Sequence, residues 1–125
     1  METKLLYQPL DRVEADAVAV ALFEDEAAPA ELKFVGAWLD ELRASGEFTG
    51  KSGELAVLHQ PQGIRAKRMI VAGAGKREKF DSAALRKTVG AVVREVKQKG
   101  VKVLAWWLNG ESAEAAVEGA LLGNF

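Results

Sequence analysis

A chain of 125 residues with 49% hydrophobic and 28% charged side chains is expected to fold as one ordinary globular domain. It contains no cysteine, so its own residues can form neither a disulfide nor a thiolate zinc site. The segment Met1–Lys4 does not begin a secretory signal, and the longest apolar run, Ala17–Phe23, is far too short to span a bilayer.

The net charge of −1 hides an uneven distribution along the chain. Residues 1–64 carry 5 basic and 12 acidic side chains, whereas residues 65–102 carry 12 basic and 3 acidic side chains. A basic segment of this kind could face nucleic acid or another acidic partner. The simpler interpretation is that its lysines and arginines solvate a helix and its loops, because no aromatic residues are interleaved as single-strand binding would require.

The first third of the chain predicts two strands and a helix. A short strand is expected at Leu5–Tyr7, and the nearly continuous apolar run at 16–23 predicts a strand that is covered on both faces of a sheet. Pro29 suits the first turn of a helix, and Gly46 suits its end. Between them, apolar residues recur at helical spacing: Leu32, Val35, Leu39 and Leu42.

The remaining chain alternates strands with helices. Strands are expected at 55–59 and 68–72, and their short connection predicts an antiparallel pair. The clearest amphipathic helix begins near Asp81 and ends at Gly100. A strand at 101–108 and a final helix from 112 to 121 follow. Alternating strands and helices imply parallel pairs with right-handed crossovers, so the predicted fold is an α/β/α sandwich of three layers around a mixed, mostly parallel sheet.

The first of two glycine-lysine segments, Gly50-Lys51-Ser52, invites comparison with a phosphate-binding P-loop. That motif requires a glycine five residues before Gly50, where this chain has Ser45. The context is also reversed, because the segment follows a predicted helix and precedes a strand. The sequence therefore argues against a nucleotide-hydrolysing P-loop.

The second segment, Gly73-Ala74-Gly75-Lys76, has a better context, because it follows a strand and precedes a helix. Ligands in open α/β sheets bind beyond the carboxyl ends of strands. Gly73 and Gly75 would let backbone N–H groups approach an anion, and Lys76 would add positive charge. A dinucleotide fingerprint lacks its third glycine, since position 78 is Glu78. The segment is a possible anion-binding loop, and the alternative is a tight turn with a solvated lysine.

The other candidate residues favour structural roles. His59 is the single histidine and has neither a second histidine nor a partnered serine. The acidic run Glu24-Asp25-Glu26 lacks the spaced ligands of a calcium loop, and the pair Trp106-Trp107 suits a core. We therefore predict no catalytic residue and no metal ligand in this chain.

The order of these segments resembles the N-terminal domain of the leucyl aminopeptidase (cytosol aminopeptidase) family of metallopeptidases. Phe48–Gly53 is similar to that family's Phe-x-Gly-Lys-x-Gly segment before a strand. Val71–Lys76 is similar to its Val-Gly-Leu-Gly-Lys turn, with alanines in place of one glycine and the leucine. The helix Ser82–Lys99 and the alanine- and glycine-rich end, Glu114–Phe125, complete the resemblance over the whole chain.

The resemblance implies a macro-domain-like fold in which residues 1–125 form a single non-catalytic N-terminal domain, with the catalytic domain outside this chain. The parent would be a cytoplasmic hydrolase, a protease that releases N-terminal residues such as leucine from peptides. Its two divalent metal ions, zinc or manganese, would be held by the missing domain, so this fragment is expected to bind no cofactor. The family's enzymes are homo-hexamers, which implies contacts with neighbouring subunits and with the chain's own catalytic domain.

Two alternative functions remain open from the sequence. A macro-domain-like module could bind ADP-ribose or another anion at Gly73–Lys76. The basic segment at 65–102 could instead bind DNA, in which case affinity would fall steeply with salt. No membrane partner is expected.

Overall fold

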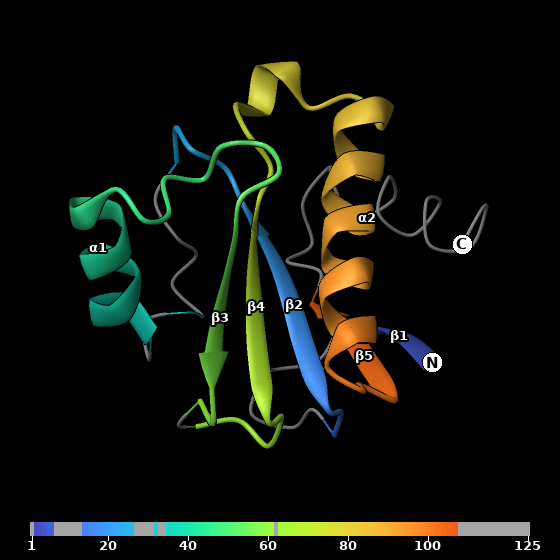
Figure 1. The fold of residues 1–125 in the computed structure, drawn as a ribbon. Helices are drawn as coiled ribbons and strands as arrows, with labels where there is room; N and C mark the ends of the chain where they lie inside the picture. Colours follow the sequence, from blue (N-terminus) through green and yellow to red (C-terminus); the bar gives the residue numbers. More distant parts are fainter. Residues whose placement is uncertain (1, 7–13, 27–31, 33–34, 62, 108–125) are drawn as a thin grey trace.

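The computed structural model describes residues 2–6, 14–26, 32, 35–61 and 63–107. These residues form one five-stranded sheet in the order β1-β5-β2-β4-β3 (Figure 1). The strands are β1 (Glu2–Leu6), β2 (Ala17–Leu22), β3 (Leu55–His59), β4 (Arg68–Gly73) and β5 (Val103–Trp107). All neighbouring pairs are parallel except β3 and β4, which are antiparallel. The predicted mixed, mostly parallel sheet is confirmed.

The sheet separates two hydrophobic cores. The helix α1 (Gly36–Ser45) packs on one core and the helix α2 (Ser82–Gln98) on the other, and Figure 1 shows them on opposite sides of the sheet. Side chains of β2 alternate between the cores: Val18 and Val20 lie with α1, whereas Ala17 and Ala19 lie with α2. This is why β2 reads as a continuous apolar run, and the three-layer arrangement is confirmed.

The expected limits of β2, β3, β4 and α2 are close to the observed ones, whereas β1 begins at Glu2, three residues before the expected start at Leu5. The first helix begins at Gly36 rather than near Pro29, a residue that lies outside the described ranges. It ends as expected at Gly46, whose φ is 80° and whose N–H donates to the Arg43 carbonyl. A short 3₁₀ helix, η3 (Arg77–Lys79), was not predicted. The predicted final helix at 112–121 lies outside the described residues.

The strand β5 begins at Val103, two residues later than predicted. The Asp16 carboxylate just before β2 accepts the backbone N–H groups of Lys102 and Val103, each at 2.9 Å. These two bonds hold the start of β5 beside the start of β2, and they lower the pKa of the Asp16 carboxyl below its ordinary value. No helix in the described part of the chain is long and apolar enough to cross a membrane.

Trp106 is a large buried side chain of the core beneath α2, with 2% of its surface exposed. Its indole Nε1 has no hydrogen-bond partner among the described residues. We expect Trp106→Phe to change the free energy of unfolding by no more than about 1 kcal/mol, because the small cavity it creates is offset by removal of an unpaired N–H. Denaturant unfolding measures this change, and a loss of about 3 kcal/mol would show that the cavity outweighs the removal of the N–H.

Candidate functional site

The two glycine-lysine segments lie against each other at the carboxyl end of β4. The Gly75 N–H donates to the Gly50 carbonyl at 2.8 Å, and the Gly73 N–H donates to the Glu54 carbonyl at 2.8 Å. In return, the Gly53 N–H donates to the Gly73 carbonyl at 3.3 Å. The segment just before β3 and the segment at the end of β4 are therefore held together by backbone bonds in both directions.

A carboxylate of the chain itself occupies the inside of the first segment. Glu54 Oε1 accepts the backbone N–H of Thr49 at 3.0 Å, the Thr49 hydroxyl at 3.0 Å and the backbone N–H of Lys51 at 2.9 Å. Successive N–H groups that converge on one oxygen form an anion-binding concavity. Burial raises the pKa of the Glu54 carboxyl, but these donors outweigh it and hold the pKa below its ordinary value. The concavity of this segment is thus filled by Glu54.

The chain after β2 joins the same cluster through one backbone bond and one ion pair. The Glu24 N–H donates to the Gly75 carbonyl at 3.0 Å. The Arg77 guanidinium pairs with the Glu26 carboxylate, a hydrogen bond that lowers the pKa of Glu26, and lies 4.3 Å from the centre of the Phe23 ring. These contacts hold the acidic run after β2 against Gly75 and η3, so the run has a structural role.

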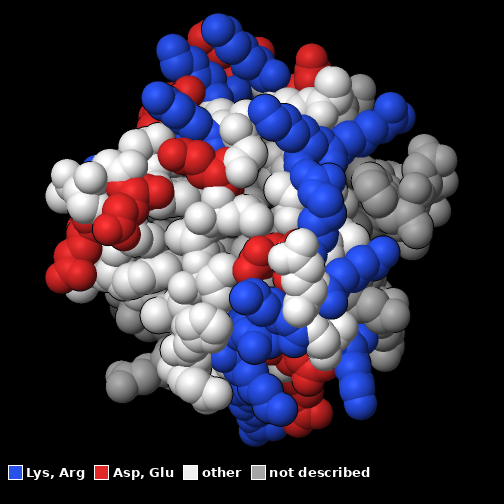
Figure 2. Space-filling model, viewed as in Figure 1, with Lys and Arg blue, Asp and Glu red and all other residues white. Residues whose placement is uncertain are grey.

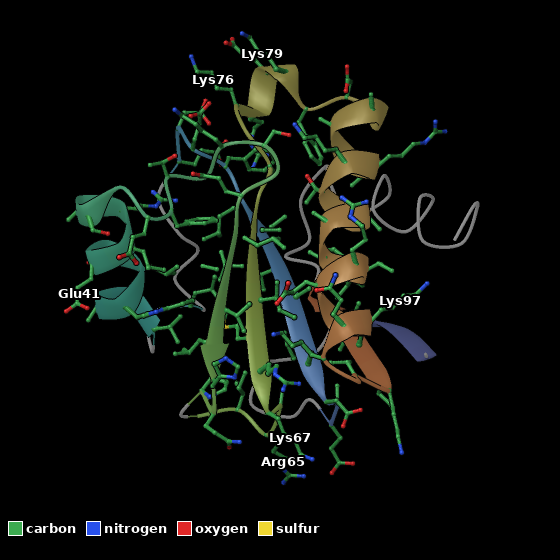
Figure 3. The ribbon with its side chains drawn as sticks, in the orientation of Figure 1. Glu41, Arg65, Lys67, Lys76, Lys79 and Lys97 are labelled. Atoms are coloured by element: carbon green, nitrogen blue, oxygen red, sulfur yellow. The ribbon has the colours of Figure 1, made fainter. Side chains whose placement is uncertain are left out.

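The predicted anion-binding loop is present in the structure, but its backbone amides are engaged. The N–H groups of Gly73 and Gly75 donate as described above, and the N–H of Ala74 donates to the Leu22 carbonyl at 2.9 Å. Lys76 is exposed, and Figure 3 shows it near Lys79 at one end of the molecule. Anion binding at Gly73, Gly75 and Lys76 stays a prediction, and in this arrangement an anion would meet the lysine side chain rather than the three amides.

The remaining candidates are separate from this cluster. His59 is exposed at the far end of β3. Within the described ranges, no group of three or more histidine, cysteine, aspartate or glutamate residues could hold a metal ion. The basic segment is spread over α2 and over the chain at both ends of the sheet, where Figure 3 labels Arg65 and Lys67 at one end and Lys76 and Lys79 at the other. The exposed charged residues of that helix are Arg86, Lys87, Arg94 and Lys97.

Glu54 was not identified from the sequence. The available signal was a glutamate directly after a glycine-lysine segment that lacks the remainder of a P-loop. An internal carboxylate can take the place of a bound anion in such a segment. Which amides it would reach depends on the fold of the segment, and residue spacing alone does not supply that.

Comparisons with known proteins show which family this chain belongs to. Residues 19–125 match the model of the cytosol aminopeptidase family, N-terminal domain. A probable cytosol aminopeptidase from Solibacter usitatus is 45% identical over 130 residues, which cover 100% of this chain and 26% of the relative. This chain therefore spans about a quarter of the length of that relative.

Solved structures show the same fold at low sequence identity. A mutant of tomato leucine aminopeptidase matches with a TM-score of 0.70 and 20% identity, covering 100% of this chain and 28% of that protein. The macrodomain of Mycobacterium tuberculosis DarG matches with a TM-score of 0.68 and 16% identity, covering 95% of this chain and 86% of that chain. The macro-domain-like fold is confirmed. The chain belongs to the cytosol aminopeptidase family and corresponds to the N-terminal domain of that family.

Proposed function

We propose that this chain is the non-catalytic N-terminal part of a cytoplasmic metallo-aminopeptidase that releases N-terminal residues such as leucine from peptides. The observation that carries the proposal is the family match over residues 19–125. It is supported by the relative named a probable cytosol aminopeptidase, in which the matched region is only 26% of the length. The peptidase chemistry is accordingly assigned to the part of the parent outside this chain.

In this proposal two divalent metal ions, zinc or manganese, act in the catalytic domain. Such ions polarise the peptide carbonyl and activate a water molecule for attack. The N-terminal domain supports assembly of a homo-hexamer and shapes access to the active site through contacts with neighbouring subunits and with its own catalytic domain. The bonded loops at Gly50–Gly53 and Gly73–Gly75 suit that role, because they give one end of the domain a fixed backbone.

An assay of two proteins side by side tests the proposal. The product of the full-length gene and the 1–125 chain are each incubated with leucine p-nitroanilide and manganese, after circular dichroism has shown that both are folded. We expect release of p-nitroaniline by the full-length protein alone, and loss of this activity with a metal chelator. Activity in the 1–125 chain would contradict its non-catalytic role, and an inactive, folded full-length protein would contradict the peptidase assignment.

A further inference from the structure

The strand β3 (Leu55–His59) forms one edge of the sheet and, within the described ranges, pairs with β4 alone. The bonds between Gly73 N–H and Glu54 carbonyl, and between Gln60 N–H and Lys67 carbonyl, show which of its residues face β4. Hydrogen-bonded pairs recur at every second residue of an antiparallel ladder. Residues 54, 56, 58 and 60 therefore bond to β4.

The intervening residues, Leu55, Val57 and His59, consequently turn their backbone N–H and C=O groups away from the sheet. The five side chains of β3 include no lysine, no proline and no carboxylate, although natural edge strands commonly use such residues to prevent pairing with other chains. Leu55 and Val57 are only half-buried on the core beneath α2. Among the described residues, the outward backbone groups of this edge have no partner, and they lie beside partly exposed apolar side chains.

The two helix layers place opposite charges on the two sides of this edge. The exposed charged residues of α1 are both acidic, Asp40 and Glu41. The exposed charged residues of α2 are all basic, and one of them, Lys87, reaches over Gly53 just before β3. Figure 2 shows mainly uncharged atoms between a red group on one side and blue groups on the other, with some red atoms among the blue, and Figure 3 shows Glu41 beside α1 and Lys97 beside α2. Glu95 of α2 is half-buried.

A second copy of the chain suits this edge poorly. Antiparallel pairing of two β3 strands around a two-fold axis perpendicular to the sheet would keep each helix layer on its own side. The basic α2 helices of the two copies would then lie on one side and the acidic α1 helices on the other, so like charges would face each other.

We propose that the outer edge of β3 binds an extended peptide segment by strand addition, with basic side chains over α1 and acidic side chains over α2. Side chains of a strand alternate between the two faces of a sheet. A segment in which basic and acidic residues alternate would therefore place each charge beside its opposite. The backbone groups of Leu55, Val57 and His59 would supply the main-chain bonds, as in other peptide sites built on a sheet edge. The proposal does not depend on the peptidase assignment.

Binding of labelled peptides to this protein tests the proposal. The probe is a fluorescein-labelled peptide of about seven residues in which lysine and glutamate alternate, with blocked ends. Its control has the same composition, with all lysines first and all glutamates last. We expect a saturable rise in fluorescence anisotropy with the alternating peptide, and at least about tenfold weaker binding of the block peptide. Shifts of the amide resonances of Leu55, Val57 and His59 would locate the site.

The protein variant Val57→Pro removes an outward N–H without removing a bond to β4, and edge strands tolerate proline at such positions. We expect it to weaken binding by at least about tenfold, whereas the matched control Val57→Thr, which keeps the N–H, should bind as the wild type does. Should Val57→Pro fail to fold, two modified peptides test the same bonds on the wild-type protein. One is methylated at the backbone nitrogens of its lysines and the other at the backbone nitrogens of its glutamates, and one of these two peptides should lose binding.

Three results would overturn the proposal. The first is equal binding of the alternating and block peptides, which would indicate a merely electrostatic contact. The second is binding that survives both Val57→Pro and the two methylated peptides. The third is a concentration-dependent shift of the Leu55, Val57 and His59 amides without any peptide, which would assign the edge to a second copy of the chain.

Discussion

Replacing Gly73 with alanine should destabilise the domain by about 3 kcal/mol, because there is no space for a side chain where the two glycine-lysine segments meet. A Cβ atom at this position would lie 2.8 Å from the Gly50 carbonyl carbon and closer still to the Lys51 carbonyl oxygen. Both atoms belong to the backbone and cannot rotate away. The segment at 50–53 would have to move, and the bond from Gly75 N–H to the Gly50 carbonyl would lengthen or break.

Denaturant unfolding of Gly73→Ala beside Gly36→Ala measures this effect. Gly36 begins α1, and a Cβ there would meet no atom within 4 Å, so its replacement tests the loss of a glycine without a steric clash. We expect the control to change the free energy of unfolding by about 1 kcal/mol or less. Equal effects of the two substitutions would show that the close approach at Gly73 contributes nothing specific to stability.

The elements with strong sequence periodicity were predictable. The buried run of β2 and the repeating valines of α2, among them Val89, Val92 and Val96, have one dominant cause, which is burial against the sheet. The short connection between β3 and β4 also sufficed to predict their antiparallel pairing. In these segments, local pattern and tertiary packing favour the same structure.

The candidate site was less predictable, because its bonds join residues distant in the sequence. The spacing of Gly73 and Gly75 indicated flexible backbone with free amides, but the partners of those amides are the carbonyls of Gly50 and Glu54. The start of β5 was misjudged for a similar reason, since the Asp16 carboxylate that holds it lies more than eighty residues earlier. Such partners follow from the order of strands in the sheet, which the sequence pattern did not specify.

Among the carboxylates near these loops, Glu54 should contribute most to the free energy of unfolding. We expect Glu54→Ala to lower the free energy of unfolding by about 2 kcal/mol at neutral pH, because the N–H groups of Thr49 and Lys51 and the Thr49 hydroxyl would lose a charged acceptor. The matched control is Glu47→Ala, since Glu47 is exposed and its carboxylate makes no hydrogen bond or ion pair among the described residues. It should change stability by no more than about 0.5 kcal/mol.

The pH dependence of unfolding separates the charge of Glu54 from its size. The folded protein holds the pKa of this carboxyl below its ordinary value of 4.5, so the unfolded state takes up a proton first as the pH falls. The stability that Glu54 contributes is therefore complete above that value and is lost as the pH falls through the lower, folded pKa. The charged groups around it, Lys51 on the same loop, Lys87 over Gly53 and Glu24 beside Gly50, remain in the variant and affect both proteins.

The isosteric variant Glu54→Gln makes the comparison specific. We expect the difference in free energy of unfolding between the wild type and Glu54→Gln to stay constant above about pH 5 and to shrink on further acidification. Asp16 and Glu26, whose pKa values are also lowered, titrate in both proteins, so their contributions cancel in the difference. A difference that stays unchanged down to about pH 2 would mean that the bonds to Thr49 and Lys51 do not depend on the charge, and that Glu54 does not act as an internal anion.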